Sequence, residues 1–224
     1  MLKLFKKRII YLLNTYVRTN AFLTRILFGV KILGNERIHW DFTTLVLKKC
    51  LKNFAKPGMK ILEIGTGPFS ILSIYISKKI ECSIDACDVN FDYVLNAEKT
   101  NMKNNANVNI FLSNLYSNVK ENYDIIFFNS VYIPETTGRN LKLDSIHKFK
   151  TDWCGGENGT EILEMFARDS GNYLKSGGII LLGVNYLYLD KVAVNNIFLN
   201  NNFNIKKNYK TKLNPSSVLI LNKN

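Results

Sequence analysis

Short apolar runs recur along the chain from residue 60 onward, and they predict the strands of a buried sheet. A strand that is covered on both faces is almost continuously apolar and lies between turn residues. Five runs fit this description: Lys60–Ile64, Cys82–Val89, Val108–Leu112, Tyr123–Phe128 and Ile179–Val184. Tyr123–Phe128 is almost wholly apolar, so we expect it near the centre of a parallel sheet.

Segments with helical spacing lie between these runs, and two further strand-like runs close the chain. The helices are expected near residues 43–54, 69–76, 93–105, 160–174 and 190–200, and the closing strands at 203–210 and 217–221. Regular alternation of strand and helix is typical of an α/β fold with a doubly wound sheet, here of seven strands. A polar stretch from Glu135 to Asp152 is long enough to be a lid or a substrate loop.

The start of the chain is basic. Residues 1–35 hold seven Lys or Arg residues and no acid, with apolar residues spaced as in one or two amphipathic helices. The longest uncharged run, Ile9–Val17, is far shorter than the about 20 residues that span a bilayer. We therefore expect residues 1–55 to form a helical cap on a main domain of residues 56–224. The alternative is contact with a membrane surface or an acidic partner.

Charge and cysteine content narrow the class of protein only slightly. The 224 residues include 30 Lys or Arg and 18 Asp or Glu, giving a net charge of +12. This balance favours nucleic acid, an anionic membrane or an acidic protein as partner, although scattered lysines are also typical of a solvated surface. The four cysteines lack metal-type spacing. We expect reduced thiols, no metal site and a cytoplasmic location.

The first predicted strand leads into the turn Gly65-Thr66-Gly67, and an apolar helix follows. A strand that ends in Gly-x-Gly before a helix brings backbone N–H groups and a helix N-terminus close to a ligand. Glu63, at the strand end, can bind an ammonium group or position the loop. A dinucleotide would need a third glycine beside its pyrophosphate, but that position is Phe69. These residues favour S-adenosyl-L-methionine as the ligand.

Two polar residues follow the next strands. Asp88 ends the second strand, 25 residues after Glu63. Ligands of an open α/β sheet bind at the carboxyl ends of the strands, where a carboxylate can accept both hydroxyl hydrogen bonds of a ribose. The alternative is that Asp88 caps the following helix. Asn114, just after the third strand, stands where a contact with adenine is expected.

Three motifs together resemble the HemK-like methyltransferases, over about residues 40–224. Glu63–Gly67 resembles the cofactor loop of that family, and Asn129–Pro134 occupies the place of its Asn-Pro-Pro-Tyr signature. Both prolines of the signature are replaced, by Ser130 and Val131. Residues 153–159 are similar to a downstream Gly-Gly-x-x-Gly turn, found particularly in the short archaeal and eukaryotic form of the family.

The resemblance implies a Rossmann-like class I methyltransferase fold with S-adenosyl-L-methionine as cofactor. The residues that it assigns to the cofactor are Glu63, Gly65, Thr66, Gly67, Asp88, Asn114 and Asn129. It also makes Asn129 and Tyr132 catalytic: the Asn129 side-chain oxygen accepts a hydrogen bond from the methyl acceptor, and Tyr132 packs flat on it. Loss of both prolines removes two fixed φ angles from this loop.

HemK-like enzymes methylate the side-chain amide of a glutamine in peptide release factors, so the resemblance implies a protein acceptor of this kind. A small molecule or a nucleic-acid amino group is the alternative acceptor, because DNA and RNA amino-methyltransferases use a similar loop. A second alternative is a protein of this fold that binds a partner without catalysis.

Overall fold

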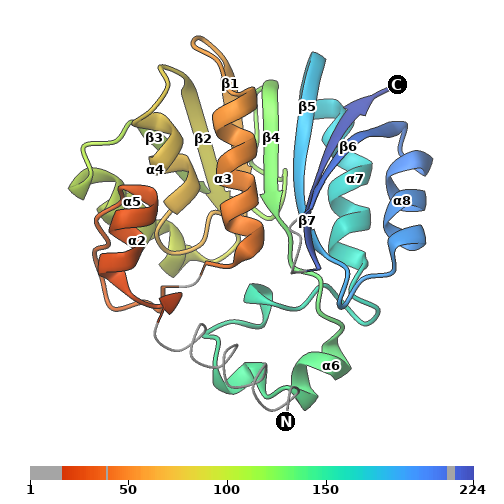
Figure 1. Ribbon diagram of the computed structural model, residues 1–224, viewed down its shortest axis with the longest axis horizontal. Helices are drawn as coiled ribbons and strands as arrows, with labels where there is room; N and C mark the ends of the chain where they lie inside the picture. Colours follow the sequence, from red (N-terminus) through yellow and green to blue (C-terminus); the bar gives the residue numbers. More distant parts are fainter. Residues whose placement is uncertain (1–16, 39, 211–214) are drawn as a thin grey trace.

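A seven-stranded sheet forms the centre of the molecule (Figure 1). The computed structural model describes residues 17–38, 40–210 and 215–224. The strand order is β3-β2-β1-β4-β5-β7-β6, with β1 to β5 parallel and β7 antiparallel to both β5 and β6. The strands are β1 (Lys60–Ile64), β2 (Ser83–Asp88), β3 (Val108–Leu112), β4 (Tyr123–Asn129), β5 (Leu174–Asn185), β6 (Phe203–Lys210) and β7 (Ser216–Lys223).

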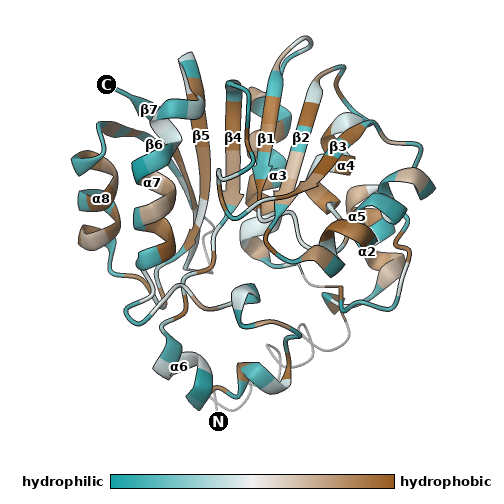
Figure 2. Ribbon diagram, turned by 180° about the vertical axis from the view of Figure 1, so that it is seen from behind, coloured by the Kyte–Doolittle hydropathy of each residue, from teal (hydrophilic) through white to brown (hydrophobic). Residues whose placement is uncertain are grey.

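Helices cover both faces of this sheet, which confirms the predicted doubly wound α/β fold (Figures 1 and 2). The described helices are α2 (Ala21–Phe28), α3 (Phe42–Phe54), α4 (Ile71–Ser77), α5 (Phe91–Lys103), α6 (Glu135–Asn140), α7 (Glu161–Tyr173) and α8 (Lys191–Asn200). Helices α3, α4 and α5 lie on one face, and α7 and α8 on the other. Strand β5 begins five residues before the predicted start, because Leu174 pairs with Tyr123 ahead of an irregularity in the ladder.

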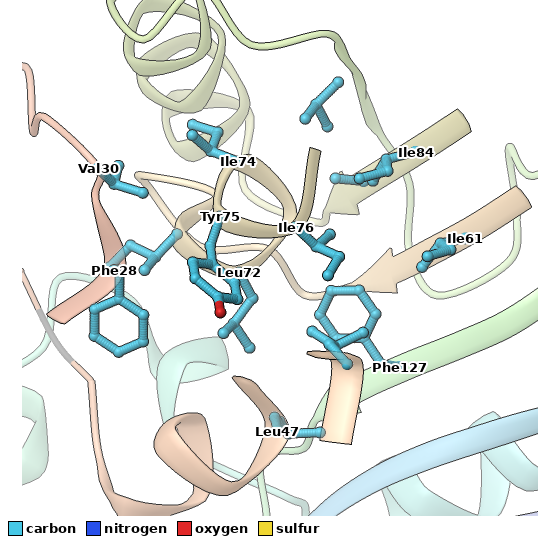
Figure 3. Close-up of a cluster of buried hydrophobic side chains, with 14 of the residues drawn as sticks. Phe28, Val30, Leu47, Ile61, Leu72, Ile74, Tyr75, Ile76, Ile84 and Phe127 are labelled. Carbon is cyan, nitrogen blue, oxygen red and sulfur yellow. The ribbon is translucent and has the colours of Figure 1, made fainter. Parts of the chain in front are cut away.

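Alternation along the central strands produces two separate apolar cores. Ile125 and Phe127 of β4 belong to the core under α3, α4 and α5, whereas Ile126 and Phe128 belong to the core under α7 and α8. Figure 3 shows the first core, where Phe127 lies near Leu47 of α3 and side chains of α4. Burial of each such side chain contributes about 1.5–3 kcal/mol, so these faces fix the register of the strands.

The order of the strands reverses between β1 and β4, which is where open α/β sheets bind ligands. The chain continues from β1 to β2 on one side of this point and from β4 to β5 on the other. The segment that contains α6 lies beyond the carboxyl ends of these strands (Figure 1), and Figure 2 shows it as mostly hydrophilic. This segment occupies the place of the predicted lid.

The N-terminal part of the described chain packs on the sheet. Helix α3 contacts β4, β5 and β7, and α2 contacts α4. Residues 1–16, which carry much of the predicted basic helix, lie outside the described residues, and the division at residue 55 remains a prediction. In the part of the chain that the structure describes, no helix combines the length and the apolar character needed to cross a membrane.

Candidate active site

A cavity of about 410 Å³ lies at the carboxyl ends of β1, β2 and β4. Seven of the eight residues singled out from the sequence line it: Glu63, Gly65, Thr66, Gly67, Asp88, Asn114 and Asn129. They come from four different strands or strand ends, so the sheet topology alone brings them together. Tyr132 is not among the residues of the described chain that line this cavity.

Glu63 forms the floor beside the glycine turn. Its side chain is buried, and Oε2 accepts hydrogen bonds from the hydroxyls of Thr66 (2.7 Å) and Ser73 (2.6 Å). Burial raises the pKa of Glu63 to about 7, although these two hydroxyls act in the opposite direction. The carboxyl group thus ties the turn to helix α4, and a cation in the cavity would favour its charged form.

The turn itself needs glycine at two positions. Gly65 and Gly67 have φ angles of +66° and +65°, in the left-handed region that other residues rarely adopt. A Cβ atom at Gly65 would also lie 3.1 Å from the ring of Phe128. The N–H group of Thr66 donates to the carbonyl oxygen of Cys87 (2.9 Å), which joins the turn to β2. A Cβ atom at Gly67 would meet open space, so the backbone there faces an unfilled region.

Asp88 anchors the same turn from the end of β2. One carboxylate oxygen accepts from the N–H group of Gly67 (2.9 Å) and the other from that of Asn90 (2.9 Å). The N-cap residue of α5 is Asn90, so Asp88 lies two residues before the N-cap and does not itself cap the helix. Burial is the largest cause that raises the pKa of Asp88, and the neighbouring Asp152 acts in the same direction. A carboxylate has about four acceptor positions, so it could still accept hydroxyl hydrogen bonds from a ribose.

The far wall of the cavity is more apolar. Asn114 is exposed and lines the cavity together with Leu115, Ile162 and Met165. Its backbone N–H group donates to the hydroxyl of Ser117 (3.1 Å), which holds the turn after β3. An amide beside apolar side chains suits a flat heterocycle with polar edges.

Asn129 ends β4 and points its amide into a confined position. Its Nδ2 donates to Thr44 Oγ1 (3.4 Å), while its Oδ1 is buried and finds no hydrogen-bond donor among the described residues. A Cβ atom at Gly183 would lie 2.8 Å from this Oδ1, so the adjacent strand needs glycine here. A buried oxygen without a partner is unfavourable by about 1–3 kcal/mol, which makes it a candidate contact for a substrate N–H group.

The loop after Asn129 is held without its two prolines. The hydroxyl of Ser130 donates to the carbonyl oxygen of Gly183 (2.7 Å), and Ser130 is buried. Farther along, the N–H group of Ile133 donates to the carbonyl oxygen of Trp153 (3.1 Å). Hydrogen bonds on both sides therefore fix the segment that the prolines would have stiffened.

The downstream glycine turn packs directly against this loop. The N–H group of Gly155 donates to the carbonyl oxygen of Ile133 (3.0 Å), and a Cβ atom at Gly155 would lie 2.8 Å from the Cα atom of Tyr132. Gly159 has a φ angle of +86°, and a Cβ atom there would lie 2.6 Å from the Tyr132 carbonyl oxygen. Close backbone approach explains why the turn is made of glycines.

Tyr132 takes a different position from the one expected. Its side chain is buried, and its ring stacks on that of Tyr188 with centroids 6.2 Å apart. Val131 is the loop residue beside Asn129 that lines the cavity. Tyr132 therefore packs beneath the loop, against Tyr188, and does not form part of the cavity wall.

The sequence did not single out the residues that close the cavity. Glu36, Arg37, Tyr93, Lys148 and Asp152 line it, although three of them come from outside the strand ends and two from the polar loop. Lys148 contacts Glu36 (2.8 Å) and Asp92 (3.0 Å), and the hydroxyl of Tyr93 donates to Asp152 (2.7 Å). The length and polarity of residues 135–152 were the only signal for this lid.

The cavity fits S-adenosylmethionine, which carries a sulfonium and an ammonium group. Buried carboxyl groups of Glu63 and Asp88 provide the negative side chains, and the open backbone at Gly67 provides room for close approach. Among the described residues there is no group of three His, Cys, Asp or Glu side chains placed to hold a metal ion.

Comparison with known proteins identifies the family of the chain. The family model described as the methyltransferase small domain matches residues 36–149. A Methanocaldococcus jannaschii protein, provisionally named a protein N5-glutamine methyltransferase, is 34% identical over 171 residues, which cover 75% of this chain and 83% of that protein. A release factor glutamine methyltransferase of Streptococcus pneumoniae is 30% identical over 164 residues, which cover 71% of this chain but only 58% of that protein.

The fold has solved counterparts as well. The crystal structure of a methyltransferase from Pyrococcus furiosus matches with a TM-score of 0.64 and 22% identity, over 96% of this chain and 95% of that one. The fold, the residues around the cavity and the matching family model agree with one another. The chain therefore belongs to the class I S-adenosylmethionine-dependent methyltransferases, as a HemK-like member of the methyltransferase small domain family.

Proposed function

We propose that the protein methylates the side-chain amide nitrogen of a glutamine in a protein acceptor. The observation that carries this proposal is that Asn129, which ends β4, lines the cavity, while its buried Oδ1 lacks a hydrogen-bond donor among the described residues. An amide NH₂ group would supply the missing donor. The names of the archaeal and streptococcal relatives support a glutamine acceptor.

The chemistry requires a weak nucleophile to be held in one orientation. Bound S-adenosylmethionine supplies a methyl group whose C–S bond breaks as the N–C bond forms, leaving S-adenosylhomocysteine, N-methylglutamine and one released proton. Asn129 Oδ1 accepts one amide N–H in this proposal, and the carbonyl oxygen of Ser130 accepts the other. Holding both N–H groups fixes the direction of the nitrogen lone pair, and such positioning can contribute several kcal/mol to catalysis.

The remaining assignments follow from the same reaction. Glu63, Gly65, Thr66, Gly67, Asp88 and Asn114 would hold the cofactor, and Tyr132 would act by supporting the acceptor loop. A cytoplasmic location is part of the proposal, and the four unpaired thiols suit a reducing compartment. Contact of the basic N-terminal segment, within residues 1–55, with a membrane surface or an acidic partner is the alternative to its role as a helical cap.

The experiment is a methyl-transfer assay with labelled S-adenosylmethionine and three acceptors: purified release factor, ribosomal RNA and a metabolite extract. We expect label in the release factor, on a single glutamine by mass spectrometry, and none after that glutamine is replaced by alanine. Asn129→Ala should abolish transfer and leave cofactor binding intact. Label in RNA or in a metabolite alone would replace the glutamine assignment with one of the alternative acceptors.

A further inference from the structure

The start of helix α3 contacts the proposed acceptor site. Asp41 is the N-cap residue of this helix, and its Oδ1 accepts from the backbone N–H group of Thr44 (2.8 Å). The backbone N–H group of Asp41 donates in return to Thr44 Oγ1 (3.1 Å), so the two residues form a capping box. Thr44 is buried and lines the cavity, which an ordinary capping residue would not do.

The hydroxyl of Thr44 has one proton, and this proton is already used in a hydrogen bond to Asp41. Thr44 Oγ1 donates to Asp41 Oδ1 (2.8 Å). A hydroxyl has one donor and two acceptor positions, and the Asp41 N–H group occupies one of the acceptor positions. The remaining position can only accept, so only a donor can face it.

The number of donor and acceptor positions on the Thr44 hydroxyl determines which end of the Asn129 amide faces Thr44. The amide carries an oxygen and an NH₂ group of nearly the same shape, and a hydrogen-bond network decides between the two orientations. Because Thr44 Oγ1 can only accept from it, the NH₂ group must lie toward Thr44, 3.4 Å away. The Asn129 oxygen is then left buried and unpaired, as the structure has it.

We propose that Asp41 and Thr44 are positioning residues that fix the orientation of the Asn129 amide, with its NH₂ group on Thr44 and its oxygen left to accept from the methyl acceptor. The inference deepens the proposed function, on which it rests, and adds a specificity element for an acceptor that donates N–H groups. If the amide reversed, an NH₂ group would face the acceptor's own N–H groups and repel them. Asp41 and Thr44 thus favour an acceptor that donates N–H groups, because they fix the orientation of the Asn129 amide.

The test compares two substitutions of Thr44 that each change the volume of the side chain only slightly. Thr44→Val keeps the shape and loses the oxygen, whereas Thr44→Ser keeps the oxygen. We expect Thr44→Val to lower kcat by about 10- to 100-fold with the cofactor Kd nearly unchanged, and Thr44→Ser to recover most of the activity.

A second measurement does not depend on activity. The side-chain amide protons of Asn129 can be assigned in a ¹⁵N–¹H spectrum by their disappearance in Asn129→Ala. Thr44→Val should shift these signals, and Thr44→Ser should leave them near their original positions. The matched control is Asp190→Ala, which removes the N-cap hydrogen bond of α8 (Asp190 Oδ1 to the Ala193 N–H, 2.8 Å) and should affect neither the signals nor kcat.

The two proposals fail in different ways. If the wild-type protein does not methylate release factor, the proposed function is wrong, and the amide signals still decide the orientation. If Thr44→Val leaves the Asn129 signals in place, or lowers kcat no more than Asp190→Ala does, Thr44 is a helix cap and the positioning role is overturned.

Discussion

The hydroxyl of Ser130 lies 2.7 Å from the carbonyl oxygen of Gly183 and donates a hydrogen bond to it. This contact joins the residue after Asn129 to the neighbouring strand β5, at the same glycine whose missing Cβ gives the Asn129 oxygen its space. A proline would fix the loop through its own φ angle, whereas Ser130 fixes it through the next strand. The departure from the family signature therefore preserves a rigid loop by other means.

Ser130→Ala tests this substitute for proline. The variant removes the hydroxyl donor of a buried carbonyl oxygen, which keeps a longer hydrogen bond from the Ser130 N–H group (3.3 Å), so we expect a loss of about 0.5–1.5 kcal/mol in the free energy of unfolding. The loop should also lose order, which would lower kcat by about 10-fold while the cofactor Kd stays the same. Urea unfolding and steady-state kinetics measure the two effects, and an unchanged kcat would show that the hydroxyl matters for stability alone.

Glu63 predicts a pH dependence of stability. Its pKa is about 7 in the folded protein against 4.5 for an ordinary glutamate, with burial as the main cause. Between these values the folded protein holds a proton that the unfolded chain has released. Stability from this group is therefore complete below pH 4.5 and is lost as the pH rises to about 7, by an amount on the order of 3 kcal/mol.

Glu63→Gln isolates that contribution. Glutamine keeps an oxygen for the hydroxyls of Thr66 and Ser73 but has no proton to release in this range. We expect urea midpoints of the cofactor-free wild type to fall more between pH 5 and pH 8 than those of the variant. Parallel pH profiles for the two proteins would mean that the Glu63 carboxyl group keeps an ordinary pKa.

Asp88→Ala should weaken cofactor binding. The variant frees the N–H groups of Gly67 and Asn90 and removes the carboxylate offered to the ribose. Loss of a charged hydrogen-bond acceptor of this kind predicts about a 10- to 100-fold higher Kd for S-adenosylmethionine by titration calorimetry. Glu98→Ala removes an exposed acid from the same helix region and is the matched control. Equal Kd values for the two variants would remove Asp88 from the site.

Tyr93→Phe probes the lid. It deletes the hydroxyl that donates to Asp152 (2.7 Å) and keeps the ring, whose centroid lies 5.2 Å from that of Phe149. A hydrogen bond to a charged group contributes about 1.5–3 kcal/mol, so we expect cofactor to dissociate about 10-fold faster in stopped-flow experiments. Tyr209→Phe, on strand β6, controls for the loss of a hydroxyl elsewhere. A dissociation rate equal to that of the control would show that this bond does not hold the lid closed.

Local patterns were sufficient for most of the fold. Val108–Leu112 matches β3 residue for residue, because a short apolar run between turns leaves few other structures open. That Glu63, Asp88 and Asn114 line one cavity was also predictable, since parallel strands end at one edge and each of these residues lies at or just after the end of a strand.

Contacts between distant segments could not be predicted in the same way. Asp41 caps α3, yet nothing local indicated that Thr44 would meet Asn129, 85 residues later. Lys148 and Glu36 are 112 residues apart, and only the folded sheet brings them together. For Tyr132, the motif predicted its position in the sequence but not the direction of its side chain. Packing of its ring against Tyr188, a contact between separate segments, determines that direction.

The two ion pairs of Lys148 have a kinetic consequence. The Lys148 side chain is 42% exposed, so dissolved ions compete directly for its contacts with Glu36 and Asp92. If leaving of the spent cofactor limits turnover, added sodium chloride should first accelerate the enzyme, and Lys148→Met should be fast already in dilute buffer and respond little to salt. Lys148 would then slow the release of the spent cofactor, to an extent that depends on the salt concentration.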